Sequence, residues 1–94
     1  MAFVLVRHKV KDYKTWKPFF AKDAAARKAA GSKNGQVFRS KDNPNEVIIL
    51  FSWDSIDNAK KFASSPKLME IMMKAGVMDK PDIYFLEEAD KVQF

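Results

Sequence analysis

Three segments of the chain are apolar at consecutive positions instead of at every second position. They are residues 3–6 (FVLV), 47–51 (VIILF) and 83–86 (IYFL). A strand with one face in water alternates apolar and polar residues, so strands like these belong to a sheet that is covered on both faces. The helices expected along the chain are enough for one face only. The pattern therefore predicts that something else covers the second face.

Capping and turn residues indicate where the helices begin and end. Asp12 is expected to cap a first helix that ends at Gly31, with Pro18 either moving its start towards Trp16 or kinking its first turn. A turn is expected at 32–35. The expected strands are 3–10, 36–40, 47–53 and 83–87, and the expected helices are 13–30, about 55–63 and about 66–75.

The first helix has an apolar face at three- and four-residue spacing, formed by Trp16, Phe19, Phe20, Ala24 and Arg27.

The last helix also has an apolar face, to which Met69, Met72 and Met73 contribute, and Met78 follows it. Ordinary core filling accounts for these methionines better than a flexible substrate lid does.

The order of the elements, β-α-β-β-α-β, predicts an α+β protein. It is the ferredoxin-like arrangement, in which a four-stranded antiparallel sheet carries its helices on one face. The 94 residues are expected to form a single domain, 1–94. An apolar second face would expose more apolar surface than a monomer in water tolerates. We therefore expect a twofold homodimer, sheet against sheet, that closes into a dimeric α/β barrel.

The composition narrows the classes of partner. With 47% hydrophobic and 31% charged residues the chain has a globular composition, without an apolar run long enough to span a membrane. It contains no cysteine, which fits the cytoplasm. The net charge is +5, but the lysines are scattered and the aromatic residues lie in apolar strands. A nucleic-acid partner is therefore not expected, although weak attraction of acidic ligands is.

His8 is the single histidine and the main candidate for chemistry. Near the end of the first strand it could act as a general base, taking a proton from a phenol or an acidic C–H group. The alternative is a half-exposed strand histidine that the charges of Arg7 and Lys9 keep neutral. One histidine without a cluster of further ligands does not make a metal site, and no nucleotide-binding motif is present. We therefore expect neither a metal nor a cofactor.

Four further residues are candidates for binding a small molecule. Trp53, with Phe51 on the same strand, could line a pocket and stack on a planar ligand, although core or dimer packing explains Trp53 equally well. Tyr84 could donate a hydrogen bond to a carbonyl or enolate, but a place in the barrel wall is the simpler explanation. Arg39 could pair with an anionic substrate group, or form a surface ion pair near the hairpin.

Several short segments, in this order and spacing, carry a family resemblance over nearly the whole chain. They are VRHKV at 6–10 with DYKTWK at 12–17, NPNEV at 43–47 leading to FSWDS at 51–55, SSP at 64–66 and YFLEE at 84–88. The chain resembles the dimeric α/β-barrel superfamily, in particular the antibiotic-biosynthesis-monooxygenase-like (ABM-like) proteins. In these a Trp often stands where Trp53 does, at the end of the third strand.

The resemblance implies a broad set of activities. Members include cofactor-independent oxygenases of aromatic polyketides, haem-degrading enzymes, small isomerases and hydrolases of signalling molecules, and their ligands generally lie between the sheet and the helices. Many members have Glu where this chain has Ser52, and many have His where Phe62 or Ala63 falls. Because such a His ligates iron in the haem-degrading branch, its absence argues against haem degradation.

The sequence as a whole predicts a small homodimer that binds an apolar, aromatic or enolisable molecule. If the protein is an enzyme, the resemblance implies cofactor-independent oxygenation or proton transfer, with His8 as the base. The alternative is a non-catalytic module for ligand binding or protein interaction. Fold alone does not choose between them.

Overall fold

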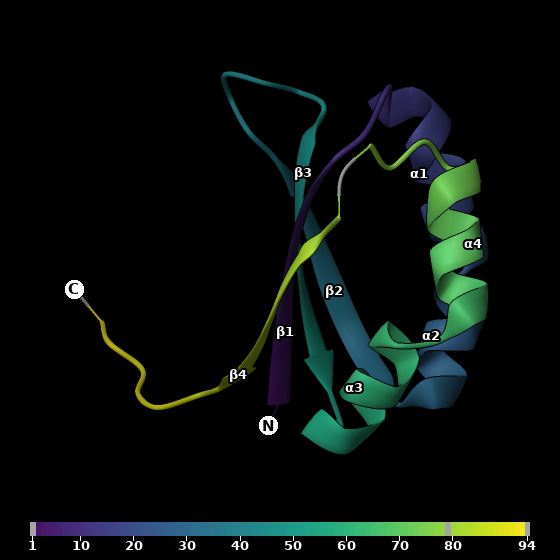
Figure 1. Ribbon diagram of the computed structural model, residues 1–94. Helices are drawn as coiled ribbons and strands as arrows, with labels where there is room; N and C mark the ends of the chain where they lie inside the picture. The colour runs from purple at the N-terminus through teal and green to yellow at the C-terminus, as the bar shows by residue number, and fades with distance from the viewer. Residues whose placement is uncertain (1, 79, 94) are drawn as a thin grey trace.

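A four-stranded antiparallel sheet forms one layer of the molecule and four helices form the other, across residues 2–78 and 80–93, which the computed structural model describes (Figure 1). All four helices cover the same face of the sheet. In chain order the elements are β1 (Ala2–Lys9), α1 (Tyr13–Lys22), α2 (Ala24–Ala30), β2 (Ser32–Arg39), β3 (Glu46–Trp53), α3 (Ile56–Ala63), α4 (Pro66–Lys74) and β4 (Asp82–Glu87).

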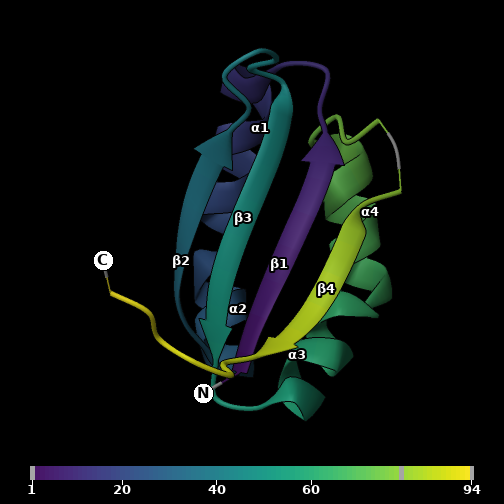
Figure 2. The same cartoon turned by 90° about the vertical axis from the view of Figure 1, so that its left-hand side faces the viewer.

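The strands lie in the order β2-β3-β1-β4, so that β1 and β3 form the centre of the sheet (Figure 2). All neighbouring strands are antiparallel, and Val4 of β1 lies between Phe51 of β3 and Phe85 of β4. This is the ferredoxin-like α+β arrangement predicted from the sequence, with the expected helix 13–30 present as two helices, α1 and α2. None of the helices in the described ranges is long and apolar enough to cross a membrane.

The sheet is apolar on both of its faces, as the strand pattern predicted. On the helix side, alternate residues of β1 and β3 are buried together with Trp16 of α1. On the other side, Phe38, Tyr84 and Leu86 expose 49%, 53% and 41% of their surface. We call this second side the open face; it turns towards the viewer in Figure 2, with no helix in front of it.

The hairpin loop between β2 and β3 holds the start of α1. The side-chain oxygen of Asn45 accepts a hydrogen bond from the backbone N–H of Tyr13 at 3.1 Å, and its carbonyl accepts one from Val10 at 2.9 Å. Asp12 stands at the N-cap position, but its carboxylate accepts a hydrogen bond from the Thr15 hydroxyl instead of from the helix backbone. The cap predicted from local sequence is thus supplied by a distant loop.

Two local predictions were wrong. The expected helix 13–30 is interrupted at Asp23 rather than reset or kinked near its start by Pro18, which lies inside α1. The expected turn at 32–35 is the first half of β2, with an irregular register between Ser32 and Asn34. There, pairing with β3 overrides the turn preference of the local sequence.

The two glycines with positive φ offer a test of how tightly the chain is packed at helix ends. Gly31 ends α2 at φ 122°, where a Cβ would clash with the carboxylate of Asp54. Gly76 follows α4 at φ 88°, but a Cβ there would lie 3.7 Å from Lys11, an ordinary contact. We predict that Gly31→Ala lowers the free energy of unfolding by about 2–3 kcal/mol and Gly76→Ala by about 1 kcal/mol. Urea unfolding of both variants measures this, and equal losses would contradict it.

Candidate functional site

A cavity of about 100 Å³ lies between the helix side of the sheet and the helices. Its walls are almost entirely apolar. The strands contribute Val4, Val6, His8, Ile49, Phe51, Trp53 and Ile83, and the helices and their connections contribute Trp16, Phe19, Phe20, Asp23, Arg27, Ala59, Phe62, Ala63, Leu68, Ile71, Met72 and Ala75.

His8 lines this cavity and is only 6% exposed. Its ring lies edge-on to that of Trp16, with the centroids 5.5 Å apart. Burial lowers the pKa of His8 to about 4, because an imidazolium would lose its hydration in this apolar setting. The ring is therefore neutral at physiological pH and keeps an available lone pair.

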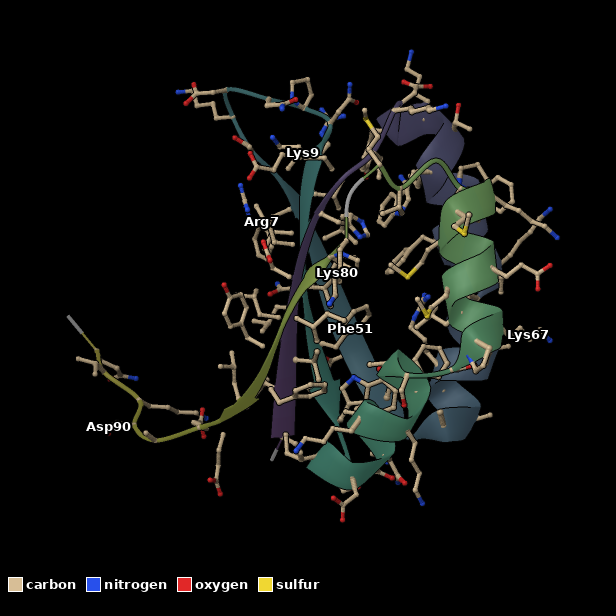
Figure 3. The ribbon with its side chains drawn as sticks, viewed as in Figure 1. Arg7, Lys9, Phe51, Lys67, Lys80 and Asp90 are labelled. Carbon is tan, nitrogen blue, oxygen red and sulfur yellow. The ribbon has the colours of Figure 1, made fainter. Side chains whose placement is uncertain are left out.

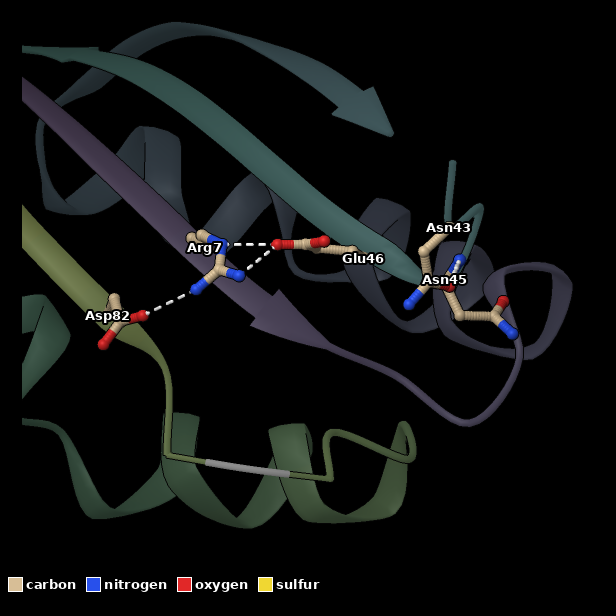
Figure 4. Close-up of polar contacts among 5 residues, drawn as sticks. All are labelled: Arg7, Asn43, Asn45, Glu46 and Asp82. Carbon is tan, nitrogen blue, oxygen red and sulfur yellow. Dashed lines mark hydrogen bonds and ion pairs between the residues drawn. The ribbon is translucent and has the colours of Figure 1, made fainter. Parts of the chain in front are cut away.

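The alternative explanation of His8 was a half-exposed residue that the charges of Arg7 and Lys9 keep neutral. Both the exposure and the cause of the neutrality were wrong. Successive strand residues point to opposite faces, so both cations lie on the open face. There Arg7 donates to Glu46 and, at 3.2 Å, to Asp82 (Figure 4). His8 is neutral because it is buried.

Three buried nitrogens in the cavity residues have no hydrogen-bond partner. They are Nδ1 and Nε2 of His8 and Nε1 of Trp53, and across the described part of the chain no other fully buried side-chain nitrogen or oxygen lacks one. Native proteins satisfy most buried polar atoms, and exceptions often mark functional sites. Here all the exceptions belong to residues that line one cavity.

Stacked aromatic rings connect His8 with the opposite end of the cavity. Trp16 and Phe20, one helical turn apart on α1, have centroids 4.8 Å apart and nearly parallel rings. Phe20 in turn lies 6.1 Å from Phe51 of β3. Figure 3 shows Phe51 on the helix side of the sheet and Arg7 on the other. These rings suit a planar, apolar ligand.

A charged pair, Asp23 and Arg27, lies at the end of this row of rings. The guanidinium carbon of Arg27 is 4.0 Å from the centre of the Phe20 ring, a cation–π contact, and Nη2 donates to the Phe20 carbonyl at 2.9 Å. The Asp23 carboxylate is 3.8 Å from Nη1. Burial lowers the pKa of Arg27 and Asp23 opposes that shift, and the guanidinium stays charged.

The structure brings together three of the five residues singled out from the sequence. His8, Phe51 and Trp53 line the cavity. Tyr84 lies on the open face, beyond the sheet from the cavity. Arg39 lies at the end of β2, away from the cavity, with its guanidinium carbon 4.4 Å from the centre of the Tyr13 ring. The surface ion pair expected as its alternative role is not formed with any of the described residues.

Sequence reasoning missed Arg27 as a site residue and placed Trp16 only on the apolar face of the first helix. The available signal was a cation on the apolar face of a helix, at the spacing that joins Trp16, Phe20 and Arg27. The core-filling explanation of the methionines was wrong at three of four positions, because only Met72 lines the cavity. Met69, Met73 and Met78 are 61%, 78% and 62% exposed.

No group of three or more His, Cys, Asp or Glu side chains suited to a metal ion occurs within residues 2–78 and 80–93. The polar groups that line the apolar cavity include a neutral imidazole, an indole N–H and a guanidinium.

The sheet order, the helices on one face and the cavity between the layers define an α+β protein with the fold of the antibiotic biosynthesis monooxygenases. A Bordetella bronchiseptica protein assigned to that group superposes with a TM-score of 0.77 at 15% identity, over 94% of this chain and 96% of that one. SnoaB, a cofactor-independent oxygenase from Streptomyces nogalater, superposes as a point variant with a TM-score of 0.75 at 15% identity, over 97% and 95% of the two chains.

A Caulobacter crescentus protein of the same group has 21% identity and a TM-score of 0.74, over 95% of this chain and 90% of that one. The similarity extends over whole chains on both sides, so the predicted ABM-like fold is confirmed. No protein-family model and no curated protein matches the sequence.

The burial of His8 predicts a specific dependence of stability on pH. Its pKa is about 4 in the folded protein and about 6.5 in the unfolded chain, so between these values the unfolded state binds more protons. Stability contributed by neutral His8 is complete above pH 6.5 and is lost as the pH falls towards 4, by about 3 kcal/mol in all. NMR titration of the single imidazole gives the pKa directly, and urea unfolding at several pH values gives the loss.

The matched control is His8→Leu, which keeps the site apolar but does not titrate. Its stability should lack the part of the decline that belongs to His8. A wild-type pKa near 6.5, or an identical decline in the variant, would contradict the assignment.

Proposed function

We propose that this protein is a homodimer that binds a small aromatic or enolisable molecule in the cavity beside His8. We further propose that it acts there as a cofactor-independent oxygenase or proton-transfer enzyme. The observation that carries the proposal is His8 itself: a buried, neutral imidazole in the wall of an apolar cavity, with no hydrogen-bond partner among the residues that the structure describes. The fold shared with SnoaB, an oxygenase without a cofactor, supports it. Location in the cytoplasm stays a prediction.

The chemistry begins with proton transfer. His8 takes a proton from a phenol or an activated C–H group, leaving an enolate or carbanion in the cavity. The buried imidazolium and the new anion stabilise each other, so that the pKa of His8 rises as the charge develops. In a proton-transfer enzyme the same proton returns to another atom of the ligand.

In an oxygenase the carbanion gives its electrons to dioxygen instead. A peroxide forms at the reacting carbon, its O–O bond breaks, and a ketone and one molecule of water result. In this reaction the reacting carbon of the ligand starts as a CH₂ group. Its two hydrogens become the hydrogens of the water, and one of them passes through His8. Dioxygen is the only oxidant required.

The size of the cavity restricts the ligand. A cavity of about 150 Å³ holds one benzene molecule, and this one is about 100 Å³. It is therefore smaller than a cavity that holds one ring, so an aromatic ligand requires a wall to move. The wall that we propose to move is α4, which has no buried residue but contributes Leu68, Ile71 and Met72 to the lining.

A second copy of this chain is the proposed cover of the open face. A twofold axis through that face would set apolar side chains against their own copies, which suits an interface that is the same on both partners. The residues that point to this face include Phe3, Leu5, Phe38, Ile48, Leu50, Tyr84 and Leu86.

The end of the chain supports this choice of partner. After β4, the tail extends from the open-face side away from its own protomer (Figure 1), and its described residues 88–93 are all exposed. They include Val92, which is 68% exposed. A facing copy would give such a tail a surface to pack on.

The catalytic proposal is tested with phenylacetone, a one-ring enolisable ketone, by following exchange of its α-protons for deuterium in D₂O by NMR. We expect the wild type to accelerate exchange and His8→Ala to lose about 100-fold of the acceleration, the lower end of what a general base contributes. Lys9→Ala, next to His8 but on the open face, is the control and should exchange at the wild-type rate. Unchanged exchange in His8→Ala would remove His8 as the base.

The dimer is tested by sedimentation at micromolar concentration. The wild type should sediment as a dimer and Leu50→Glu as a monomer, because the substitution would bury a charge in the interface. Met73→Glu introduces the same side chain at an exposed position of α4 and should leave the dimer intact. A monomeric wild type would refute this part of the proposal.

One observation favours a second candidate, a non-catalytic binding module. A base with a pKa of about 4 is weak at neutral pH until a ligand raises it. Phenylacetone that binds, shown by quenching of the cavity tryptophans, but exchanges no faster than in buffer would favour this candidate.

A further inference from the structure

A second hollow opens on the surface beside the cavity, between α2 and the first half of β2. It has a volume of about 270 Å³, and three cationic residues, Arg27, Lys28 and Lys33, are among those that line it. No aspartate or glutamate does. We call it the basic cleft.

The basic cleft and the apolar cavity share a wall. Phe20, Arg27 and Phe51 line both. Gly35 helps to hold Phe51 in this wall, because a Cβ at position 35 would come within 2.9 Å of Cδ1 of the Phe51 ring. The two hollows are therefore neighbours, with the guanidinium of Arg27 between them.

The hydrogen-bonding capacity of Arg27 is largely unused within the described protein. A guanidinium has five N–H donors. One bond is formed, to the Phe20 carbonyl, and the 3.8 Å separation from Asp23 is too long for a hydrogen bond. The side chain is nevertheless 12% exposed, so the charge is mostly withdrawn from water. A partly buried cation with free donors is suited to bind an anionic group in a bidentate manner.

We propose that the ligand is an aryl carboxylate: its ring occupies the apolar cavity and its carboxylate binds Arg27 from the basic cleft. This rests on the proposed function and adds the chemical class of the ligand. It also accounts for the small cavity, which needs to hold only the ring while the polar end lies in the cleft. Lys28, Lys33 and the net charge of +5 attract such an anion from solution.

The test compares phenylacetate with phenylacetamide, a neutral molecule of nearly the same shape. Trp16 and Trp53 both line the cavity, so quenching of their fluorescence reports binding. The wild type should bind phenylacetate about tenfold more tightly, the factor that corresponds to about 1.4 kcal/mol. Added salt should reduce this preference.

Two substitutions should change the preference in opposite directions. Arg27→Met keeps an unbranched stem over Phe20 but removes the charge, and should bind the two molecules equally. Asp23→Asn removes the carboxylate that competes for Arg27, and should increase the preference for phenylacetate. Lys67→Met, on the solvent side of α4 (Figure 3), removes a charge away from the cleft and should behave as the wild type.

The outcomes separate this inference from the proposed function. Equal binding of the two molecules by the wild type, or a preference that survives in Arg27→Met, would overturn the carboxylate assignment and leave the cavity as a binding site. Binding of the amide by Arg27→Met shows that the variant is folded. Quenching by neither molecule at millimolar concentration would overturn both the assignment and the proposed function.

Discussion

Burial of side chains on both faces of β1 and β3 is the constraint on which the rest of the structure depends. Successive residues of a strand point to opposite sides, so two central strands without polar alternation need two apolar environments. The four helices supply one environment, on the side of Val4 and Phe51. On the other side none of the described elements covers the sheet, and the same apolar pattern that specifies the sheet favours the second copy proposed above.

The candidate site follows from this constraint. His8 belongs to the same alternate positions of β1 as Val4, and it is the one polar residue among the β1 residues that point to the helix side of the sheet. The low pKa is therefore a consequence of the fold and not of a particular charged neighbour. A group so placed has no hydrogen-bond partner among the described residues, and the ligand proposed above would supply one.

The fold could be predicted from the sequence because continuous apolar runs of strand length and apolar positions at helical spacing, together with Gly31 at the end of the first helical region, are local signals. The early start of β2 could not, because pairing of β2 with β3 determines it at long range, and no glycine or proline stands at the interruption at Asp23. The site was predicted in part. His8, Phe51 and Trp53 could be assigned to the site because alternate residues of a strand point to the same face of the sheet. The approach of Arg27 to Phe51 has no signal in the local sequence, because it brings together side chains of α2 and β3.

The ion pairs of Arg7 determine the balance of charge at one end of the open face. At one end of that face two cations, Arg7 and Lys9, stand among two carboxylates, Glu46 and Asp82, so the charges there balance. Arg7 is paired with both carboxylates (Figure 4). A chain that lost only Arg7 would keep two carboxylates against one cation there, which leaves one net negative charge at the edge of an apolar surface. The arginine thus keeps neutral the end of the face on which we propose that a second copy docks.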